Sequence, residues 1–334
     1  MNKQLFGRNE QGNEVFLYTI ENENVRVSVT DYGAVMVSIV NKKTGQDILL
    51  GYDTVEEYIT NSGHLGGFIG RTANRIKNAE FELNGQVFHL EKNSGNNNIH
   101  GGTDGFDRVM YETEMKETSV VFHRLSPNGE EGYPGDLDVR VTYTLLEDGV
   151  EMKAEGTALD QDTIFAMTNH NYYSLDDSET IERHVVRIPA EQYAIDSDDG
   201  ISQLPLLPVE NTAFDFRTPK ELGRDLFDSD AQIQDNRGYD HHFAVDGEGL
   251  RLFAECTAGD LKLIVESNLP GMHMYTANFL NAKGKGGRDY GPHKAVCFEP
   301  EFIPNGINYE DVVKPIVRKG ETSVQVIRMR MENL

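Results

Sequence analysis

The 334-residue sequence predicts an antiparallel all-β protein, either a sandwich or a barrel. Apolar and polar residues alternate with a period of two over most of the chain, which is the pattern of half-buried strands. Turn-forming dipeptides separate these runs, and helical patterns are short and few. The sequence shows no linker, no low-complexity tract and no repeat. We therefore expect residues 1–334 to form a single β domain.

The clearest strands occur in three places along the chain. Residues 25–30 and 137–145 alternate strictly, and residues 324–327 suggest a closing strand. Between such runs lie the turn signals Asn84-Gly85, Asp148-Gly149 and Gly259-Asp260, of which the first two suit the left-handed backbone of tight hairpins. Residues 54–59 and 219–226 carry the best helical patterns, whereas 204–208 and 225–236 are expected to be long loops.

Composition limits the classes of partner. The chain has 31 Lys and Arg residues against 55 Asp and Glu residues, a formal net charge of −24. Such a chain repels nucleic acid and anionic membranes. The two cysteines, Cys256 and Cys297, show neither metal-ligand spacing nor a disulfide framework, which fits a reducing compartment. The first residues lack the apolar core of a signal peptide, and no segment reaches the length of a membrane span. We expect a cytoplasmic protein.

The most informative segment is residues 66–102, which is rich in glycine and asparagine. Glycine turns allow side chains to approach a ligand closely. Arg71, Asn74, Arg75 and His100, together with the asparagines, offer hydrogen-bond donors and acceptors of the kind that bind hydroxyl groups. The segment predicts a sugar site.

Two further polar clusters follow strand-like runs. His170 lies in residues 168–173, where it is either a proton-transfer group or a hydrogen-bonded structural histidine. Asp240 lies in residues 238–243 and is either an anchor for sugar hydroxyls or an ordinary turn residue. The neighbouring His241 and His242 raise the possibility of a metal. No His or Cys recurs nearby at metal-site spacing, so we expect no metal site.

The last cluster is residues 296–305. Glu299 follows an apolar run, and burial there would raise its pKa and make it a stronger base once ionised. Glu301 would share its face in a regular strand, but Pro300 leaves open that Glu301 is solvated. Cys297 has no basic neighbour in sequence, and we interpret it as core packing.

Seven motifs, taken in order, resemble the aldose 1-epimerases, also called galactose mutarotases. They span nearly the whole chain: residues 70–76 (GRTANRI), 98–102 (NIHGG), 132–135 (GYPG), 168–172 (TNHNY), 239–241 (YDH), 275–279 (YTANF) and 298–300 (FEP). This resemblance implies a large antiparallel β-supersandwich with few short helices. It also implies an isomerase that interconverts the α and β anomers of aldohexoses such as galactose and glucose, with no metal or organic cofactor.

The resemblance also implies roles for individual residues. Glu299 corresponds to the general base, His170 to the general acid, and His100 to a second histidine close to the ring oxygen. Asn74, Arg75 and Asp240 correspond to sugar ligands. The reaction needs an acid–base pair because the hemiacetal opens when the C1 hydroxyl loses a proton while the ring oxygen gains one.

Three positions depart from the family pattern. His273 and Glu301 stand where members often carry glutamine, and Asn305 stands where aspartate is common. These changes bear on sugar preference, and we expect His273 to contact sugar hydroxyls. The alternatives are a hexose-6-phosphate 1-epimerase, which needs more basic residues, a non-catalytic sugar-binding or sensor protein, and a glycoside hydrolase. The expected partner is a small-molecule aldose, bound by a monomer or homodimer.

Overall fold

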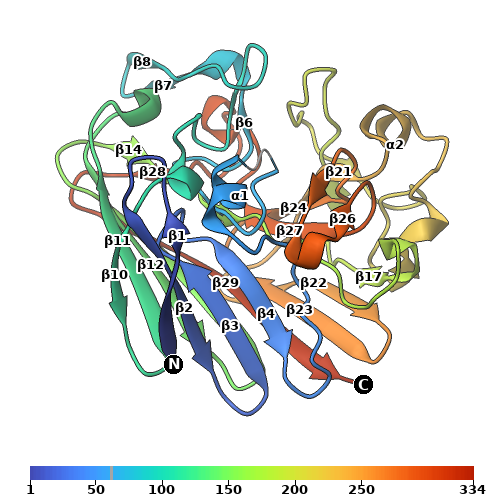
Figure 1. Cartoon of the computed structure of the whole chain (residues 1–334). Helices are drawn as coiled ribbons and strands as arrows, with labels where there is room; N and C mark the ends of the chain where they lie inside the picture. Colours follow the sequence, from blue (N-terminus) through green and yellow to red (C-terminus); the bar gives the residue numbers. More distant parts are fainter. Residues whose placement is uncertain (61–62) are drawn as a thin grey trace.

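A computed structural model describes residues 1–60 and 63–334, and Figure 1 shows that strands are the main regular structure. Every ladder between the described strands is antiparallel. This confirms the all-β prediction and leaves only two short α-helices in the described residues, α1 (Val55–Thr60) and α2 (Ala231–Asn236).

Three sheets form the body of the protein. The four-stranded sheet has the order β1 (Asn2–Arg8), β2 (Glu14–Glu21), β3 (Val25–Thr30) and β4 (Met36–Asn41). The nine-stranded sheet has the order β10 (Glu112–Met115), β11 (Ser119–Ser126), β12 (Leu137–Leu145), β13 (Gly149–Ala158), β29 (Thr322–Asn333), β23 (Leu261–Ser267), β22 (Arg251–Ala258), β17 (Val185–Arg187) and β20 (Lys220–Glu221). The six-stranded sheet has the order β16 (Tyr172–Tyr173), β27 (Val296–Glu301), β24 (Gly271–Tyr275), β21 (Asp240–Ala244), β18 (Gln192–Tyr193) and β19 (Leu207–Pro208).

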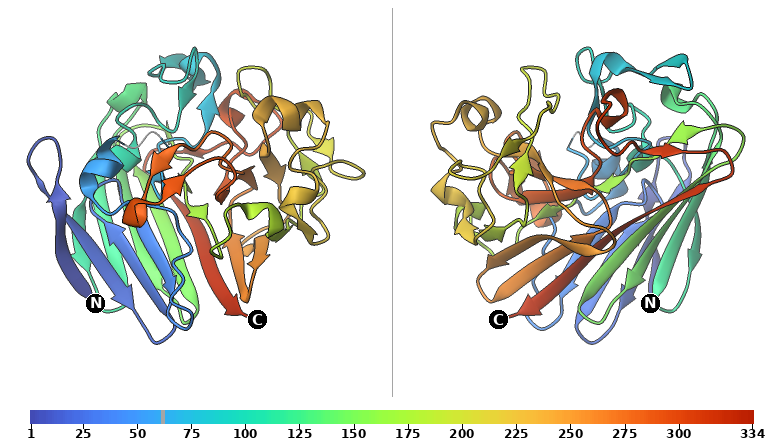
Figure 2. Two further views of the ribbon diagram at one scale, coloured as in Figure 1. Left: turned by 45° about the vertical axis from the view of Figure 1, so that its right-hand side comes forward. Right: turned by 180° about the vertical axis from the view of Figure 1, so that it is seen from behind.

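Five two-stranded pairs complete the structure. They are β14 (Thr163–Ile164) with β28 (Ile316–Val317), β15 (Thr168–Asn169) with β5 (Phe68–Ile69), β6 (Arg75–Ile76) with β9 (Asn98–Ile99), β7 (Glu80–Leu83) with β8 (Gln86–His89), and β25 (Ala282–Lys283) with β26 (Asp289–Tyr290). The loops that join these pairs lie at the end of the long strands where the six-stranded sheet is found (Figures 1 and 2).

One hydrophobic core joins the three sheets. Tyr18 on β2 packs edge-on against Phe122 on β11 at a centroid distance of 6.0 Å, so the four-stranded sheet covers one half of the nine-stranded sheet. Phe243, Met272 and Phe298 of the six-stranded sheet belong to the same buried cluster as Phe253 on β22. Figure 2 shows the resulting layers from two sides. This sandwich arrangement decides between the two architectures that the alternation pattern left open.

The hairpin and helix predictions had mixed outcomes. Asn84 and Gly85 both have positive φ and join β7 to β8, as predicted. Asp148-Gly149 does lie in a hairpin, but neither residue adopts positive φ because the connection between β12 and β13 is longer, closed by Leu146 N–H donating to Gly149 O. Residues 54–59 match α1. The helix expected at 219–226 was wrong: that segment forms β20 and a single 3-10 turn, Leu222–Arg224.

The loop expected at 225–236 contains α2. The side chain of Asp230 caps this helix by accepting a hydrogen bond from Gln232 N–H at 2.8 Å. Such an N-cap contributes about 1 kcal/mol. Because the helix has only six residues, its hydrophobic period is too short to be recognised in the sequence.

The six-stranded sheet has one apolar and one polar face. Side chains alternate along each strand, so Phe243, Met274 and Phe298 point into the core. The cross-strand register then places His242, His273 and Glu299 in one row on the opposite face. This face is therefore lined by ionisable side chains. Among the described residues, no helix is long and apolar enough to cross a membrane.

Candidate active site

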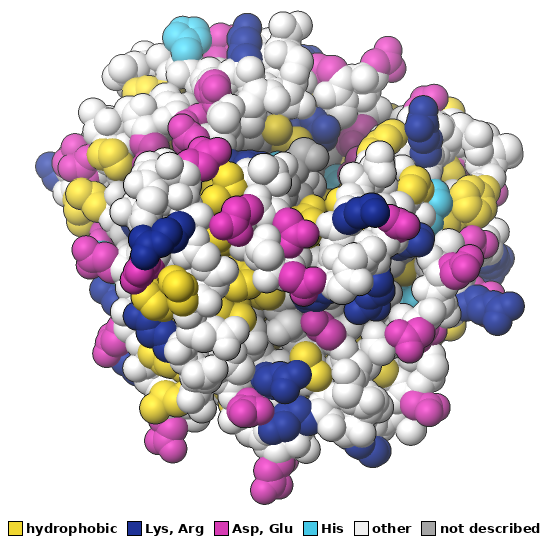
Figure 3. Space-filling view, viewed as in Figure 1, with side chains coloured by type: hydrophobic (Ala, Val, Ile, Leu, Met, Phe, Trp, Pro, Cys, Tyr) yellow, Lys and Arg dark blue, Asp and Glu magenta, His cyan; other side chains and the backbone are white. Residues whose placement is uncertain are grey.

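A cavity of about 910 Å³ opens over the polar face of the six-stranded sheet. Seven of the residues predicted from the sequence line it: Asn74, Arg75, His100, His170, Asp240, His273 and Glu299. They come from five separate parts of the chain, which the fold brings together. On the outer surface, basic and acidic side chains are interspersed over the face shown in Figure 3.

Glu299 and His170 form a buried pair at the floor of the cavity. Glu299 Oε2 lies 3.7 Å from His170 Nε2, and the two residues are 3% and 6% exposed. Burial raises the pKa of Glu299 to about 8, a shift that the His273 charge reduces and the Asp240 charge increases. Burial also lowers the pKa of His170 to about 3, with a further decrease from His64. Burial disfavours the charge on Glu299 alone and the charge on His170 alone. In an ion pair at this distance, the attraction between the two charges would offset both costs.

His170 is held by backbone and aromatic contacts. Its N–H donates to Gly67 O at 3.0 Å, and its carbonyl accepts from Gly66 N–H at 2.9 Å. The ring of Tyr172 stacks on the imidazole at a centroid distance of 5.0 Å. The neighbouring Asn171 does not contact the ring, because its side chain points toward Met36 and Tyr173 in the core.

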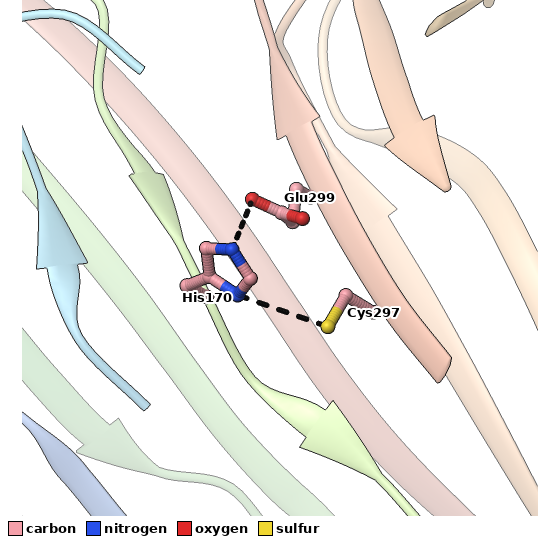
Figure 4. A group of neighbouring side chains, drawn as sticks. All are labelled: His170, Cys297 and Glu299. Atoms are coloured by element: carbon pink, nitrogen blue, oxygen red, sulfur yellow. Dashed lines mark hydrogen bonds and ion pairs between the residues drawn. The ribbon is translucent and has the colours of Figure 1, made fainter. Parts of the chain in front are cut away.

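Cys297 contacts the other ring nitrogen of this histidine. Figure 4 shows the imidazole of His170 between the Glu299 carboxyl and the Cys297 thiol, whose Sγ lies 3.7 Å from Nδ1. The three residues offer nitrogen, sulfur and oxygen atoms within 4.8 Å of one another. Burial raises the pKa of Cys297 well above its usual value, which disfavours the thiolate that metals prefer. Because Glu299 and Cys297 face different ring nitrogens, the set suits a hydrogen-bonded chain.

His100 is a neutral hydrogen-bond donor. It follows β9, and its Nδ1 accepts from Asn74 N–H at 3.3 Å, which leaves the proton on Nε2. Burial lowers the pKa of His100 well below its usual value, and His64 and His170 add to the effect. The ring lies 5.3 Å from that of His170, centroid to centroid.

Asp240 and His273 are paired on neighbouring strands. His273 Nε2 lies 2.6 Å from Asp240 Oδ1. Burial alone would raise the pKa of Asp240, but the hydrogen bond and charge of His273, together with Arg75, hold it below its usual value. Asp240 is therefore an ionised acceptor at the cavity wall. Arg75 lines the same cavity with its guanidinium against Gly200, and within residues 1–60 and 63–334 that guanidinium has no hydrogen-bond partner.

Two residues of the glycine-rich segment lie outside the cavity, although the sequence predicted them to belong to the sugar site. Arg71 does not line the cavity: its guanidinium is buried and donates to Ser126, Pro127, Pro134 and Thr163. Asn98 is likewise structural, because it accepts from the Tyr133 hydroxyl at 3.1 Å. Both side chains tie the cavity loops to the sheet, whereas Asn74, Arg75 and His100 face the cavity.

The structure also settles the positions that depart from the family pattern. Glu301 is buried like Glu299, so β27 continues through Pro300 and the solvated alternative was wrong. His273 lines the cavity. Asn305 has positive φ and accepts from Lys77 N–H at 3.0 Å, which makes it a loop anchor.

His64 is a cavity residue that the sequence reasoning missed. Its Nδ1 lies 2.7 Å from Asp107 Oδ2, and its ring lies 4.8 Å from His100 and 6.1 Å from His170, centroid to centroid. Asp107 is 43 residues away in the chain, so no local pattern revealed the pair. The only signal was a histidine between glycines just before residues 66–102.

Comparisons with known proteins point to one family. The model of the aldose 1-epimerase family matches residues 17–330. The human galactose mutarotase is 35% identical over 93% of this chain and 92% of its own length, and the Haemophilus influenzae aldose 1-epimerase is 36% identical over 88% of each chain. A galactose 1-epimerase structure from Lactobacillus acidophilus superposes with a TM-score of 0.89, at 27% identity, covering 99% of this chain and 98% of the other.

The fold and the likeness to epimerases along nearly the whole chain thus define a sugar isomerase. The chain belongs to the aldose 1-epimerase family. It is an enzyme of the aldose 1-epimerase type, as the family resemblance implied.

Proposed function

We propose that this enzyme interconverts the α and β anomers of aldohexoses such as galactose and glucose, with Glu299 as general base and His170 as general acid. The observation that carries the assignment is the buried Glu299–His170 pair, with Oε2 and Nε2 3.7 Å apart at the floor of a polar cavity. The names of the human and Haemophilus relatives, a galactose mutarotase and an aldose 1-epimerase, support the same substrate class.

The proposed reaction starts and ends with one proton shared between Glu299 and His170. The C1 hydroxyl gives its proton to Glu299, the bond between C1 and the ring oxygen breaks, and the ring oxygen takes a proton from His170. The freed aldehyde rotates about C1–C2. The ring closes on the other face of the carbonyl, the new C1 oxygen regains a proton from Glu299, and His170 recovers its own. A positioned acid and base contribute typically ~10²–10⁴-fold each.

The remaining cavity residues bind the sugar. Asp240 accepts hydrogen bonds from hydroxyls, and Arg75 and Asn74 donate to them. His100 offers its Nε2 proton on the same side as His170, which suits the ring oxygen. Contacts away from C1 hold the open chain while it rotates, so the intermediate is not lost before ring closure.

The alternative hexose-6-phosphate substrate gains no support from the cavity lining. Of the described residues around the cavity, Arg75 and Arg108 are the guanidinium groups, whereas four residues carry carboxyl groups: Glu10, Asp104, Asp240 and Glu299. Carboxylates repel a phosphate dianion, and a phosphate site needs several converging cations.

Polarimetry with freshly dissolved α-glucose and α-galactose tests the proposal. The wild-type enzyme should accelerate the change in optical rotation of at least one sugar. Glu299→Gln keeps the shape of the side chain but cannot accept the proton, and turnover should fall ~10²-fold or more. A variant that keeps more than about a tenth of wild-type turnover, with an unchanged melting temperature, would refute the assignment of the base.

A further inference from the structure

His273 lies at the centre of the polar face, on the middle one of three neighbouring strands. It faces His242 across the β21–β24 ladder and Glu299 across the β24–β27 ladder. Residues directly opposite in an antiparallel pair have Cβ atoms about 4.5–5.5 Å apart. The His273 ring is therefore a direct neighbour of the catalytic base, although it is 26 residues away in sequence.

Two carboxyl groups flank this imidazole. Asp240 Oδ1 lies 2.6 Å from Nε2, and Glu301 Oε1 lies 3.7 Å from Nδ1. Glu301 is fully buried, and neither of its oxygens has a hydrogen-bond partner among the described residues. A buried, unpartnered carboxyl group destabilises a fold by several kcal/mol unless a nearby charge or proton compensates. Two rings lie beside it: His242 Nδ1 is 3.6 Å and His273 Nδ1 is 3.7 Å from Glu301 Oε1. Burial lowers the pKa of His242 to about 3, so His273 is the ring that can supply the compensating charge.

We propose that Asp240 and Glu301 hold His273 as an imidazolium, and that this fixed positive charge allows the buried Glu299 to exist as the carboxylate that acts as base. This inference rests on the proposed function of Glu299. His273 is then more than a sugar contact: it sets the proton affinity of the base. Glu301 is a positioning residue that acts through His273.

The charges around the ring favour this assignment. His273 is faced by Asp240 and His242 from β21, and by Glu299 and Glu301 from β27. The other groups around it are Arg75 at the start of β6 and Asn74, His100, His170 and Asp196 from the connecting segments. Four of these groups are carboxyls, and Asp240, whose pKa His273 holds below its usual value, is the main source of negative charge. Burial raises the pKa of Glu301 well above its usual value, an effect that the His273 charge opposes. Burial would lower the pKa of His273, but the hydrogen bond and charge of Asp240, with Glu301 and Glu299, raise it to about 9. The effect is mutual, since His273 lowers the pKa of Glu299.

One contact distinguishes the two protonation states of the ring. Asn74 Nδ2 lies 3.3 Å from His273 Nδ1, and in the neutral ring it would donate to that nitrogen. In the imidazolium, Nδ1 carries a hydrogen and cannot accept from Asn74, and the Glu301 carboxyl 3.7 Å away is a charge partner for the ring. The flanking carboxyls favour the charged state, and the experiment below separates the two.

The test is the pKa of Glu299 in His273→Gln, a variant that keeps hydrogen bonding but removes the charge. With ¹³C-carboxyl-labelled glutamate, the Glu299 signal is assigned by its loss in Glu299→Gln and then titrated by NMR. Loss of an opposite charge at this distance should raise the pKa of Glu299 by about one unit or more. The alkaline limb of the kcat profile should move up by the same amount. Because the His273 charge also lowers the pKa of His170, its loss partly restores the ion pair, and turnover at pH 7 should fall by less than about tenfold.

Two further variants complete the experiment: Glu301→Gln is a second test, and His242→Gln is its matched control. Glu301→Gln should move the same limb in the same direction by a smaller amount, because it weakens the hold on the His273 charge. His242→Gln removes an imidazole at the same depth whose pKa burial already lowers to about 3, so no charge is lost and the limb should stay in place. Glu301→Gln also keeps the proposal testable if His273→Gln fails to fold.

The outcomes separate this inference from the proposed function. An active Glu299→Gln variant overturns the base assignment itself. The second outcome is that Glu299→Gln is inactive but the pKa of Glu299 is unchanged in folded His273→Gln. This result overturns only the electrostatic role of His273 and assigns its ring to the neutral state, in which Asn74 donates to Nδ1. A shift of equal size in His242→Gln would also overturn the proposal, because it would show a general effect of altered packing.

Discussion

At the scale of single residues, Glu299 and His170 hold one proton between them. With pKa values of about 8 for Glu299 and about 3 for His170, the pair carries one proton over the range between these values. The ion pair and the neutral pair differ only in which side chain has that proton. The proposed reaction passes from one to the other and back, so the enzyme ends each turnover in its starting state.

We therefore predict a bell-shaped pH profile for kcat/KM. Activity should fall above about pH 8, where the pair loses its proton and has no acid. It should fall again toward about pH 3, where a second proton binds and no base remains. Initial rates of mutarotation from pH 3 to 10, corrected for the spontaneous reaction, measure both limbs. A flat profile across this range would contradict the acid–base pair.

A second residue-scale prediction concerns His64. Because Asp107 holds Nδ1, the other ring nitrogen is available to the cavity that the residue lines. His64→Phe keeps an aromatic ring but removes this polar contact, and loss of a hydrogen bond of ~0.5–1.5 kcal/mol should raise KM about 2–10-fold with a smaller change in kcat. Asp107→Asn is the companion variant and should have a weaker effect in the same direction. Unchanged KM values in both folded variants would show that His64 does not contact the sugar.

The sequence predicted the chemical types of the site residues better than their contacts. Motif resemblance brought Glu299, His170 and Asp240 to one site before any geometry was known, and all three line the cavity. Arg71 and Arg75 lie four residues apart and look equivalent in sequence, yet only Arg75 reaches the cavity. Their difference comes from partners 55–92 residues beyond Arg71, which no local pattern shows.

At the scale of elements, Arg71 joins the glycine-rich segment to β11 and β14. We predict that Arg71→Met lowers the free energy of unfolding by ~3 kcal/mol or more, because several buried carbonyl and hydroxyl groups lose their donor. Urea denaturation measures the change. Arg75→Met is the matched control and should weaken sugar binding with little loss of stability. The reverse pattern in the two variants would contradict the placement of these side chains.

The strand predictions were correct where the alternating pattern continued over many residues. β3 and β12 match residues 25–30 and 137–145 because apolar and polar side chains alternate along both. In β12 this alternation follows one buried face, whereas in β3 the polar Ser28 and Thr30 are buried as well. β20 and the following 3-10 turn escaped recognition, since Lys220 is buried through its ammonium contacts with Ala213 O and Asp225 and so breaks the expected pattern. Two-residue strands such as β5 and β15 carry too few side chains to show any period.

At the scale of the whole molecule, the single-domain organisation stays a prediction. The buried cluster that includes residues from all three main sheets supports it. We expect one cooperative thermal transition, with equal calorimetric and van't Hoff enthalpies. Two resolved transitions would show that the sheets unfold as separate units. The expected monomer or homodimer can be distinguished by sedimentation equilibrium in the same buffer.

The two-faced six-stranded sheet has a consequence for how this enzyme tolerates insertions and deletions. Shifting a strand by one residue exchanges its faces, so a single deletion near the start of β27 would turn Glu299 toward the core and Phe298 toward the cavity. A shift by two residues restores the faces and displaces the side chains only along the strand. In a library of insertions and deletions, variants that change β21, β24 or β27 by an even number of residues should therefore fold more often than variants that change them by an odd number. Insertions and deletions in the surface loops should show no such difference.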